Sequence, residues 1–245
     1  MTVVWLSAAV AAVWIGVVWI NRRRVARYDG SGDPAAGIVV FVEPVRWLFI
    51  IWGFVGACMG LRQGDARHAI YLFRWSRRAG SLFVLPDLIR RHRLNAKAGR
   101  LARFIERLAW EHPRSTIHLI GYSSGVYVAF EAVKLLPAEI VLGRVIAVHG
   151  TISPAYDLRP VLARADIVNV FGKMDFLING IGPLLFGAND RVRSLACGMV
   201  GFHMAAERLS QREWSWTDIA DGYWGGHFTV MTSSWIRRNI ASLLQ

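Results

Sequence analysis

The sequence predicts an α/β fold: a mostly parallel sheet with helices on both faces, preceded by an N-terminal transmembrane helix. From Ile38 onward, short apolar runs alternate with amphipathic helical patterns, which is typical of parallel strands joined by helical crossovers. The amino end carries an uncharged apolar segment that is long enough to cross a bilayer. The chain has 245 residues, which is enough to bury the core of one domain.

The composition points to a membrane partner and excludes several classes of protein. A formal net charge of +12 together with 11 tryptophans favours contact with a membrane surface. The 23 glycines and 8 prolines exclude collagen-like and Pro/Gly-rich disordered chains. The two cysteines, Cys58 and Cys197, exclude a disulfide framework and any CxxC motif. The chain has no segment of the kind that reads or stacks on bases, so nucleic acid is not an expected partner.

Residues 1–24 are predicted to form a membrane anchor with a basic flank. No charged residue occurs from Thr2 to Ile20, and Asn21-Arg22-Arg23-Arg24 follows directly. A secretory signal carries its positive charge before the apolar run, so an uncleaved anchor is favoured over a cleaved signal or a buried core helix. Because arginines mark the cytoplasmic side, we expect this single anchor to hold the remaining domain at the membrane in the cytoplasm.

The segments that follow the anchor predict a linker and then the start of the domain. The segment Asp29-Gly30-Ser31-Gly32-Asp33-Pro34 has the composition of a flexible linker, so we expect a linker over residues 25–37 before a domain over 38–245. The apolar stretch Ile38–Gly60 is interrupted by charges and a proline. We expect a strand over Ile38–Val42 and then a helix over Trp47–Met59 at the lipid surface. A second membrane-dipping segment is the alternative.

Strands and helices alternate through the rest of the domain. The apolar residues of each expected helix recur at helical spacing, and those of each expected strand form a short continuous run. The predicted strands are Ile38–Val42, Ala69–Arg74, Thr116–Ile120, Arg144–His149 and Asp166–Phe171. The predicted helices are Asn95–Trp110, Val126–Leu136 and Thr229–Leu244.

A Gly-x-Ser-x-Gly motif lies between a predicted strand and a predicted helix. It reads Gly121-Tyr122-Ser123-Ser124-Gly125. A sharp turn at this point holds Ser123 in a strained backbone conformation, and Gly121 and Gly125 leave room for the neighbouring chain. The Ser123 hydroxyl is then exposed at the carboxyl edge of the sheet. The amide of Ser124 points to the place where an oxyanion would form.

A nucleophilic serine needs a base, and the base needs an orienting acid. Asp175 follows the predicted strand Asp166–Phe171, so it lies at the carboxyl edge of the sheet. His227 precedes the last helix, and the two glycines before it let a loop bring the imidazole over that edge. We therefore predict Asp175 as the acid and His227 as the base. Asp157 and Asp190 are the alternative acids.

Another histidine, His149, also ends a predicted strand. It precedes the predicted acid in the chain, whereas the expected order is serine, acid, histidine. The remaining histidines are scattered and show no spacing typical of metal ligands. We therefore expect no metal site.

The Gly-x-Ser-x-Gly turn, the strand followed by Gly-x-x-Asp and the late Gly-Gly-His resemble the α/β-hydrolase superfamily from about Ile38 to the chain end. Within it, the chain is similar to a bacterial group of serine hydrolases or lipase-like proteins, through Phe186–Asp190 and Ala196–Phe202. The resemblance implies an α/β-hydrolase fold in which Ser123, Asp175 and His227 are nucleophile, acid and base. It implies no cofactor.

One position departs from the pattern of this superfamily. The superfamily places His-Gly after the strand matched by Ile38–Val42, and backbone N–H there completes the oxyanion hole. Here Glu43-Pro44 stands at those positions, and proline has no N–H to donate. We expect Ser124 and Glu43 to supply the two donors, with Val45 or a rearranged loop as the alternative. A poor oxyanion hole costs about 10²–10³ in rate.

The expected reaction is hydrolysis of an ester bond through an acyl-enzyme. Residues 176–205 begin with the apolar run Phe176–Leu185, where such proteins carry a lid or acyl pocket, so we expect an apolar or lipid-like ester as substrate and membrane lipid as partner. One alternative is a non-catalytic membrane scaffold that keeps the fold. The other is a thioesterase or acyltransferase that uses the same three residues.

Overall fold

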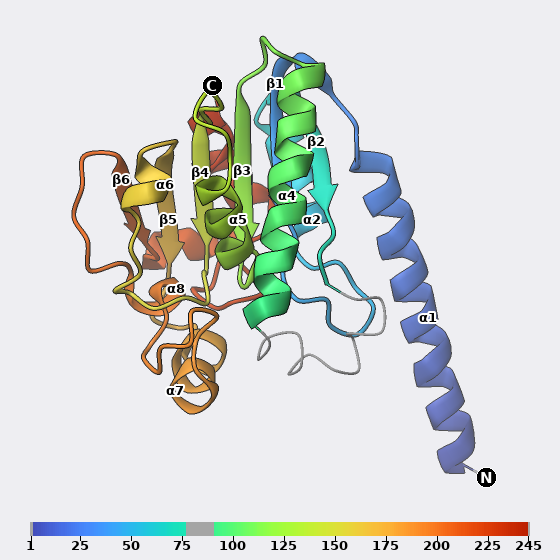
Figure 1. The fold of residues 1–245 in the computed structure, drawn as a ribbon. Coiled ribbons are helices and arrows are strands. Elements are labelled where there is room, and N and C mark those ends of the chain that lie inside the picture. The colour runs from blue at the N-terminus through green and yellow to red at the C-terminus, as the bar shows by residue number, and fades with distance from the viewer. Residues whose placement is uncertain (1, 77–90, 245) are drawn as a thin grey trace.

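Six parallel strands form one sheet at the centre of the molecule (Figure 1). The computed structural model describes residues 2–76 and 91–244. The strand order is β2-β1-β3-β4-β5-β6, and every neighbouring pair in this described sheet is parallel. The predicted fold class is confirmed. The strands are β1 (Asp33–Val42), β2 (His68–Phe73), β3 (Ile117–Tyr122), β4 (Arg144–Val148), β5 (Asp166–Phe171) and β6 (Leu209–Glu213).

Helices cover both faces of the sheet, and each face has its own apolar core (Figure 1). In the central strands, Val40 and Leu119 face one core while Val39 and Ile120 face the other, and all four are fully buried. Strands covered on both faces are apolar on both sides, which explains their continuous apolar runs. The first face carries α4 (Arg91–Glu111), α5 (Gly125–Lys134) and α6 (Arg159–Leu162), and the second carries α2 (Phe54–Gln63) and α9 (Ser233–Asn239).

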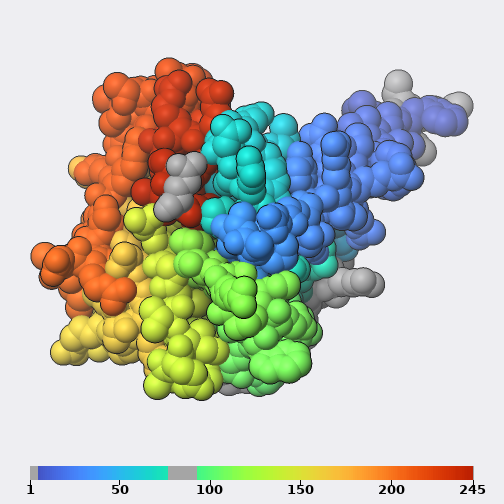
Figure 2. All heavy atoms as spheres, turned by 90° about the horizontal axis from the view of Figure 1, so that it is seen from above, coloured from blue at the N-terminus to red at the C-terminus, as the bar shows by residue number. Residues whose placement is uncertain are grey.

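The N-terminal helix α1 (Thr2–Tyr28) projects from this body (Figures 1 and 2). Its segment Trp5–Tyr28 is long and apolar enough to cross a membrane, and none of its most apolar window is buried. The last turns of the helix contact the domain. Val25 is buried, and Oδ1 of Asn21 accepts a hydrogen bond from the Ile51 amide at 3.1 Å.

The expected linker over residues 25–37 is wrong. Helix α1 continues to Tyr28, and β1 begins at Asp33, so only a four-residue turn separates the two elements. The physical reason is a tertiary contact between the turn and the sheet. The Asp29 carboxylate accepts the Leu72 amide at 2.9 Å, and this contact ties the turn to β2.

The helix expected over Trp47–Met59 begins later and packs differently. Helix α2 starts at Phe54, and its Ala57 and Cys58 are buried against α9, so this helix belongs to the core and not to a lipid surface. The preceding residues form an irregular loop in which Leu48 and Phe49 have positive φ. Only the loop, with Trp47, keeps exposed apolar side chains.

The carboxyl-terminal part is less regular than the sequence predicts. The edge strand β6 was not predicted, because its sequence Leu-Ser-Gln-Arg-Glu is polar and largely exposed. The helix expected over Thr229–Leu244 begins at Ser233 and is interrupted after Asn239. The remaining elements are η2 (Phe176–Ile181, a π-helical turn), α7 (Gly182–Phe186), α8 (Cys197–Val200), η3 (Trp216–Asp221) and η4 (Ala241–Leu244).

Candidate active site

Ser123 lies in the sharp turn between β3 and α5, at the carboxyl edge of the sheet. Its φ of 56° is in the left-handed region, which residues with a side chain rarely adopt. A Cβ on Gly121 would lie 2.9 Å from Cα of Val126, and a Cβ on Gly125 would lie 2.4 Å from the carbonyl oxygen of Val42. Both glycines are therefore needed for the close approach of β1, β3 and α5 that fixes Ser123 in this turn.

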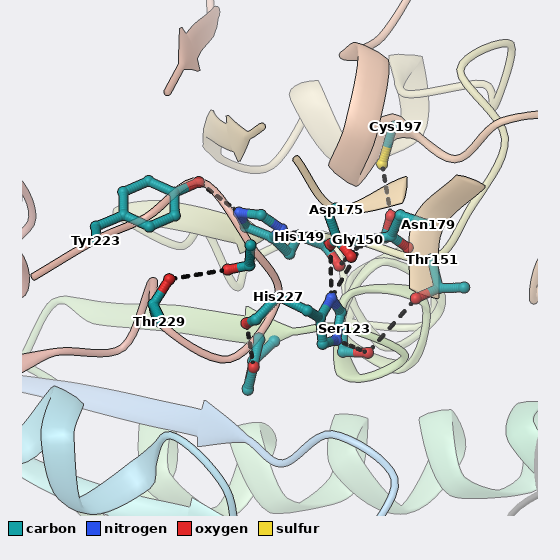
Figure 3. A network of polar contacts seen from close by, with 12 residues as sticks. Ser123, His149, Gly150, Thr151, Asp175, Asn179, Cys197, Tyr223, His227 and Thr229 are labelled. Carbon is teal, nitrogen blue, oxygen red and sulfur yellow. Dashed lines mark hydrogen bonds and ion pairs between the residues drawn. The ribbon is translucent and has the colours of Figure 1, made fainter. Parts of the chain in front are cut away.

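A chain of hydrogen bonds joins Ser123, His227 and Asp175 (Figure 3). Nε2 of His227 lies 2.9 Å from Oγ of Ser123, and Nδ1 of His227 lies 2.6 Å from Oδ2 of Asp175. The three residues come from the turn after β3, the loop after β5 and the loop before α9, and all three are buried. This arrangement can move the hydroxyl proton to the imidazole, whose positive form the carboxylate stabilises.

The loop that carries His227 is held by Tyr122, the last residue of β3. The Tyr122 hydroxyl donates a hydrogen bond to the carbonyl oxygen of His227 at 2.6 Å. The two rings also stack, with centroids 5.3 Å apart. Gly225, with φ of 75°, makes the loop possible, because a Cβ there would lie 2.8 Å from the indole of Trp214. The imidazole therefore has a fixed support directly beside Ser123.

A second histidine binds the same carboxylate (Figure 3). His149 follows β4, is fully buried, and its Nδ1 lies 2.6 Å from Oδ2 of Asp175. Its Nε2 lies 2.5 Å from the Tyr223 hydroxyl. Asn179 also donates to Asp175 Oδ2, at 2.6 Å. A neutral His149 satisfies this pattern by donating from Nδ1 and accepting from Tyr223 at Nε2.

The charges of this group follow from burial and hydrogen bonding. Burial by itself raises the pKa of Asp175, but the hydrogen bonds from His149 and His227 outweigh burial and lower the pKa to about 2. Burial lowers the pKa of His149, although the carboxylate beside it acts in the opposite direction. At neutral pH, Asp175 is therefore ionised and His149 is neutral.

The donor atoms of His149, Asp175 and His227 lie within 4.8 Å of one another, which is close enough to hold a metal ion. Both Nδ1 atoms, however, already contact the same oxygen of Asp175, and the other nitrogens face the hydroxyls of Tyr223 and Ser123. Hydrogen bonding alone therefore accounts for the cluster.

Ser124 provides backbone and side-chain donors beside Ser123. It precedes α5, so its amide belongs to the amino terminus of that helix, where N–H dipoles favour negative charge. The Ser124 hydroxyl accepts a hydrogen bond from the Val45 amide at 3.1 Å. A hydroxyl that accepts still has its own hydrogen to donate.

The expectation that Glu43 supplies the second oxyanion donor is wrong. Its amide already donates to the carbonyl oxygen of Phe73 at 3.3 Å, as β1 continues its pairing with β2. Its carboxylate is buried and accepts hydrogen bonds from Arg46 at 3.1 Å and from the Ser76 hydroxyl at 2.8 Å. Burial raises the pKa of this carboxyl, and the neighbouring Arg46 opposes that effect. Glu43 is thus part of the supporting structure.

An apolar cavity of about 280 Å³ opens beside Ser123 and His227. Its wall includes a polar group that the sequence did not reveal. Asn189 is buried, and its Nδ2 has no hydrogen-bond partner among the described residues. The apolar side chains that line the cavity are Pro44, Val45, Trp47, Trp52, Leu177, Ile178, Pro183, Phe186 and Phe228.

The alternative acids lie elsewhere. Asp157 is exposed and pairs with Arg159 at 2.8 Å. Asp190 accepts the amide of Ser153 at 3.2 Å. The sequence places His149 at the end of a predicted strand but, by its order in the chain, outside the site. Parallel β4 and β5 are neighbours, so the residue that follows β4 lies beside the loop that carries Asp175.

No protein-family model and no curated protein matches the chain. Among solved structures, it is similar to a Trichoderma reesei cutinase in complex with a C11Y4 phosphonate inhibitor, at 13% sequence identity and a TM-score of 0.44. The match covers 98% of this chain and 92% of that chain. A likeness at this level carries no argument about activity. By its own parallel sheet and strained serine turn, the fold is α/β-hydrolase-like.

Proposed function

We propose that the protein is a membrane-anchored serine hydrolase that cleaves an ester bond of an apolar or lipid-like substrate. The observation that carries the proposal is the hydrogen-bonded chain from Ser123 Oγ through His227 to Asp175, at a strained turn beside an apolar cavity. A hydroxyl, an imidazole and a buried carboxylate in this geometry are the parts needed for acyl transfer.

In the proposed first step, Ser123 Oγ attacks the ester carbonyl carbon while its proton passes to Nε2 of His227. Asp175 is ionised and holds the imidazole in the tautomer with hydrogen on Nδ1. His227 then gives the proton to the leaving alcohol oxygen as the ester C–O bond breaks, which leaves an acyl group on Ser123. A water molecule, deprotonated by His227, releases the acid and restores the serine.

We propose that the developing oxyanion accepts hydrogen bonds from two donors of Ser124. Its amide lies at the amino terminus of α5, where the helix dipole favours negative charge. Its hydroxyl, fixed by the Val45 amide, supplies the second donor in place of the backbone N–H that Pro44 lacks. Asn189 also lines the cavity, but its Nδ2 is buried and has no hydrogen-bond partner among the described residues.

The membrane and substrate assignments rest on the exposed apolar surface. Large apolar side chains near the mouth of the cavity are exposed, among them Leu177, Phe186 and Phe228. A soluble monomer rarely exposes so many together. In Figure 1, the strand arrowheads point towards α7, and the amino end of α1 extends on the same side. A bilayer crossed by α1 would therefore meet the face on which the cavity opens.

One observation favours a second candidate, a non-catalytic membrane scaffold that keeps the fold. Pro44 has no N–H and the amide of Glu43 is used within the sheet, so the loop after β1 offers no backbone donor at these two positions. A site with a weak oxyanion hole loses about 10²–10³ in rate. The two candidates differ in whether Ser123 becomes acylated.

Hydrolysis of p-nitrophenyl esters of increasing acyl length, by the full chain in detergent micelles, tests the proposal. We expect kcat/KM to rise with acyl length because the cavity is apolar, by up to about fourfold per CH₂. Ser123→Ala should lower the rate by about 10⁴-fold, since it removes the nucleophile. A folded protein with no ester hydrolysis above that of Ser123→Ala would contradict the hydrolase and support the scaffold.

A further inference from the structure

A groove of about 400 Å³ separates α1 from the domain, away from Ser123. On the α1 side it is lined by Trp14, Val17 and Ile20, and on the domain side by Ile50 and Val55 among others. Val17 and Ile20 are 40% and 47% exposed, so the groove opens to the surroundings of the apolar helix. The groove is not part of the cavity described above.

Trp52 lies between the groove and the cavity at Ser123. It is the residue that lines both hollows in the described part of the chain. Its indole stacks on Trp47 with centroids 6.3 Å apart and lies 5.6 Å from the Phe228 ring, and both of those rings line the cavity. The three aromatic side chains thus form one apolar cluster between the groove and the cavity.

Polar contacts hold the loop before α2 against α1. Asn21, which lines the groove, accepts the Ile51 amide at 3.1 Å and faces the Ile51 carbonyl oxygen at 3.4 Å. The Trp52 indole donates to the carbonyl oxygen of Trp47 at 3.1 Å. Helix α1 therefore contributes one fixed wall of the groove, in addition to any role as an anchor.

We propose that the groove between α1 and the loop before α2 binds the acyl chain of a lipid ester and guides it past Trp52 to Ser123. The proposal rests on the proposed function and extends it by naming the path and the ligand. An acyl chain fits because the wall is mainly apolar, follows α1 from Trp14 to Arg24, and faces the bilayer that α1 would cross. Arg24 lies on the same groove and suits the anionic headgroup of such a lipid.

A photoreactive phosphonate tests where the acyl chain lies. The full chain in vesicles of phosphatidylcholine and phosphatidylglycerol is treated with a hexadecyl fluorophosphonate that carries a diazirine at the end of its tail. Ser123 Oγ bonds to phosphorus as fluoride leaves, and light then links the tail to its neighbours. We expect cross-links in segments 14–24 and 50–56. Cross-links confined to 176–186 on labelled protein would overturn the path and leave the hydrolase intact.

Two matched substitutions on α1 sharpen the test. Ile20→Trp places a bulky ring in the groove and should lower the yield of cross-links to 50–56 by about tenfold. Ile15→Trp makes the same change at a side chain that is 67% exposed and lies outside the groove, and it should leave the yield unchanged. Equal yields in the two variants would also overturn the path. Absence of any label on Ser123 would overturn the proposed function and, with it, the path.

Discussion

At the scale of single residues, the central feature is one carboxylate shared by two histidines. Oδ2 of Asp175 accepts a hydrogen bond from Nδ1 of His227, which faces Ser123, and another from Nδ1 of His149, which faces Tyr223. Each N–O distance is 2.6 Å. The second histidine removes part of the freedom of the carboxylate and stabilises its ionised form. His149 is thus a positioning residue that acts through Asp175.

Replacement of His149 tests this role. His149→Ala removes one charged hydrogen bond to Asp175, and we expect kcat to fall about tenfold while KM changes little, because His149 lies behind the acid. His149→Asn should retain most of the activity, since its amide can donate as Nδ1 does and Asn tolerates the φ of 47°. Steady-state kinetics of the two folded variants measure the difference. An unchanged kcat in His149→Ala would show that Asp175 does not depend on His149.

The sequence predicts a site residue where a local motif or the end of a strand places that residue at the carboxyl end of the sheet. The motif around Ser123 and the loops that carry Asp175 and His227 have such signals, and the structure brings these three residues together. The sequence gives no such signal for Asn189 or Tyr223, because their positions depend on loops that only the folded chain brings together. The wrong expectation for Glu43 has the same cause, since its amide is used by pairing with a distant strand.

At the scale of elements, the turn between β3 and α5 depends on close backbone contact. Gly125→Ala would place a Cβ 2.4 Å from the Val42 carbonyl oxygen and 2.6 Å from that of Glu43. Backbone atoms cannot move cheaply, so we expect a loss of about 1–3 kcal/mol in the free energy of unfolding and a loss of ester hydrolysis. Denaturant unfolding and the p-nitrophenyl ester assay measure the two effects.

A matched glycine on another helix is the control. Gly99 lies within α4, and among the described residues a Cβ there would meet only the far end of the Arg103 side chain, at 3.7 Å. Gly99→Ala should therefore stabilise the protein by up to about 1 kcal/mol and leave hydrolysis unchanged. If Gly125→Ala behaved like Gly99→Ala, the close approach of β1 and α5 would not matter for the turn.

Among the elements, the buried strands were predictable and the exposed or irregular ones were not. Strand β5 is observed over the predicted range Asp166–Phe171, because a strand covered on both faces needs an apolar run. Strand β6 is a polar strand at the edge of the sheet, so no apolar run marks it in the sequence. The apolar stretch that forms α2 was assigned to a lipid surface, because hydrophobicity alone does not distinguish a membrane-facing helix from one buried against α9.

At the scale of the whole molecule, the carboxyl and amino ends of the parallel strands carry different histidine pairs. The carboxyl edge holds the group around Asp175, and the amino edge holds His68 and His118, whose ring centroids lie 5.6 Å apart. Burial lowers the pKa of His118 to about 4, with further effects of the same sign from His68 and Arg144. This pair lies near the amino ends of β2 and β3, whereas Ser123 follows the carboxyl end of β3, so we expect the pair to affect stability and not the reaction.

Stability should therefore fall in mild acid. The unfolded chain binds a proton at His118 below about pH 6.5, whereas the folded chain does so only below about pH 4. Between these values the unfolded state binds more protons, and the free energy of unfolding should drop by about 3 kcal/mol as the pH falls to 4. Unfolding curves at a series of pH values measure this drop. His118→Gln should remove that part of the dependence, and equal slopes in both proteins would contradict it.

The most direct test of the account is the reaction of Ser123 with a fluorophosphonate, followed by mass spectrometry of the full chain. We expect one label on Ser123, no label in Ser123→Ala, and labelling at least about 10²-fold slower in His227→Gln because the base is gone. Asp157→Asn, which changes an exposed acid outside the site, should label at the rate of the unmodified protein. A folded protein that takes no label, or one that His227→Gln labels equally fast, would contradict an activated serine.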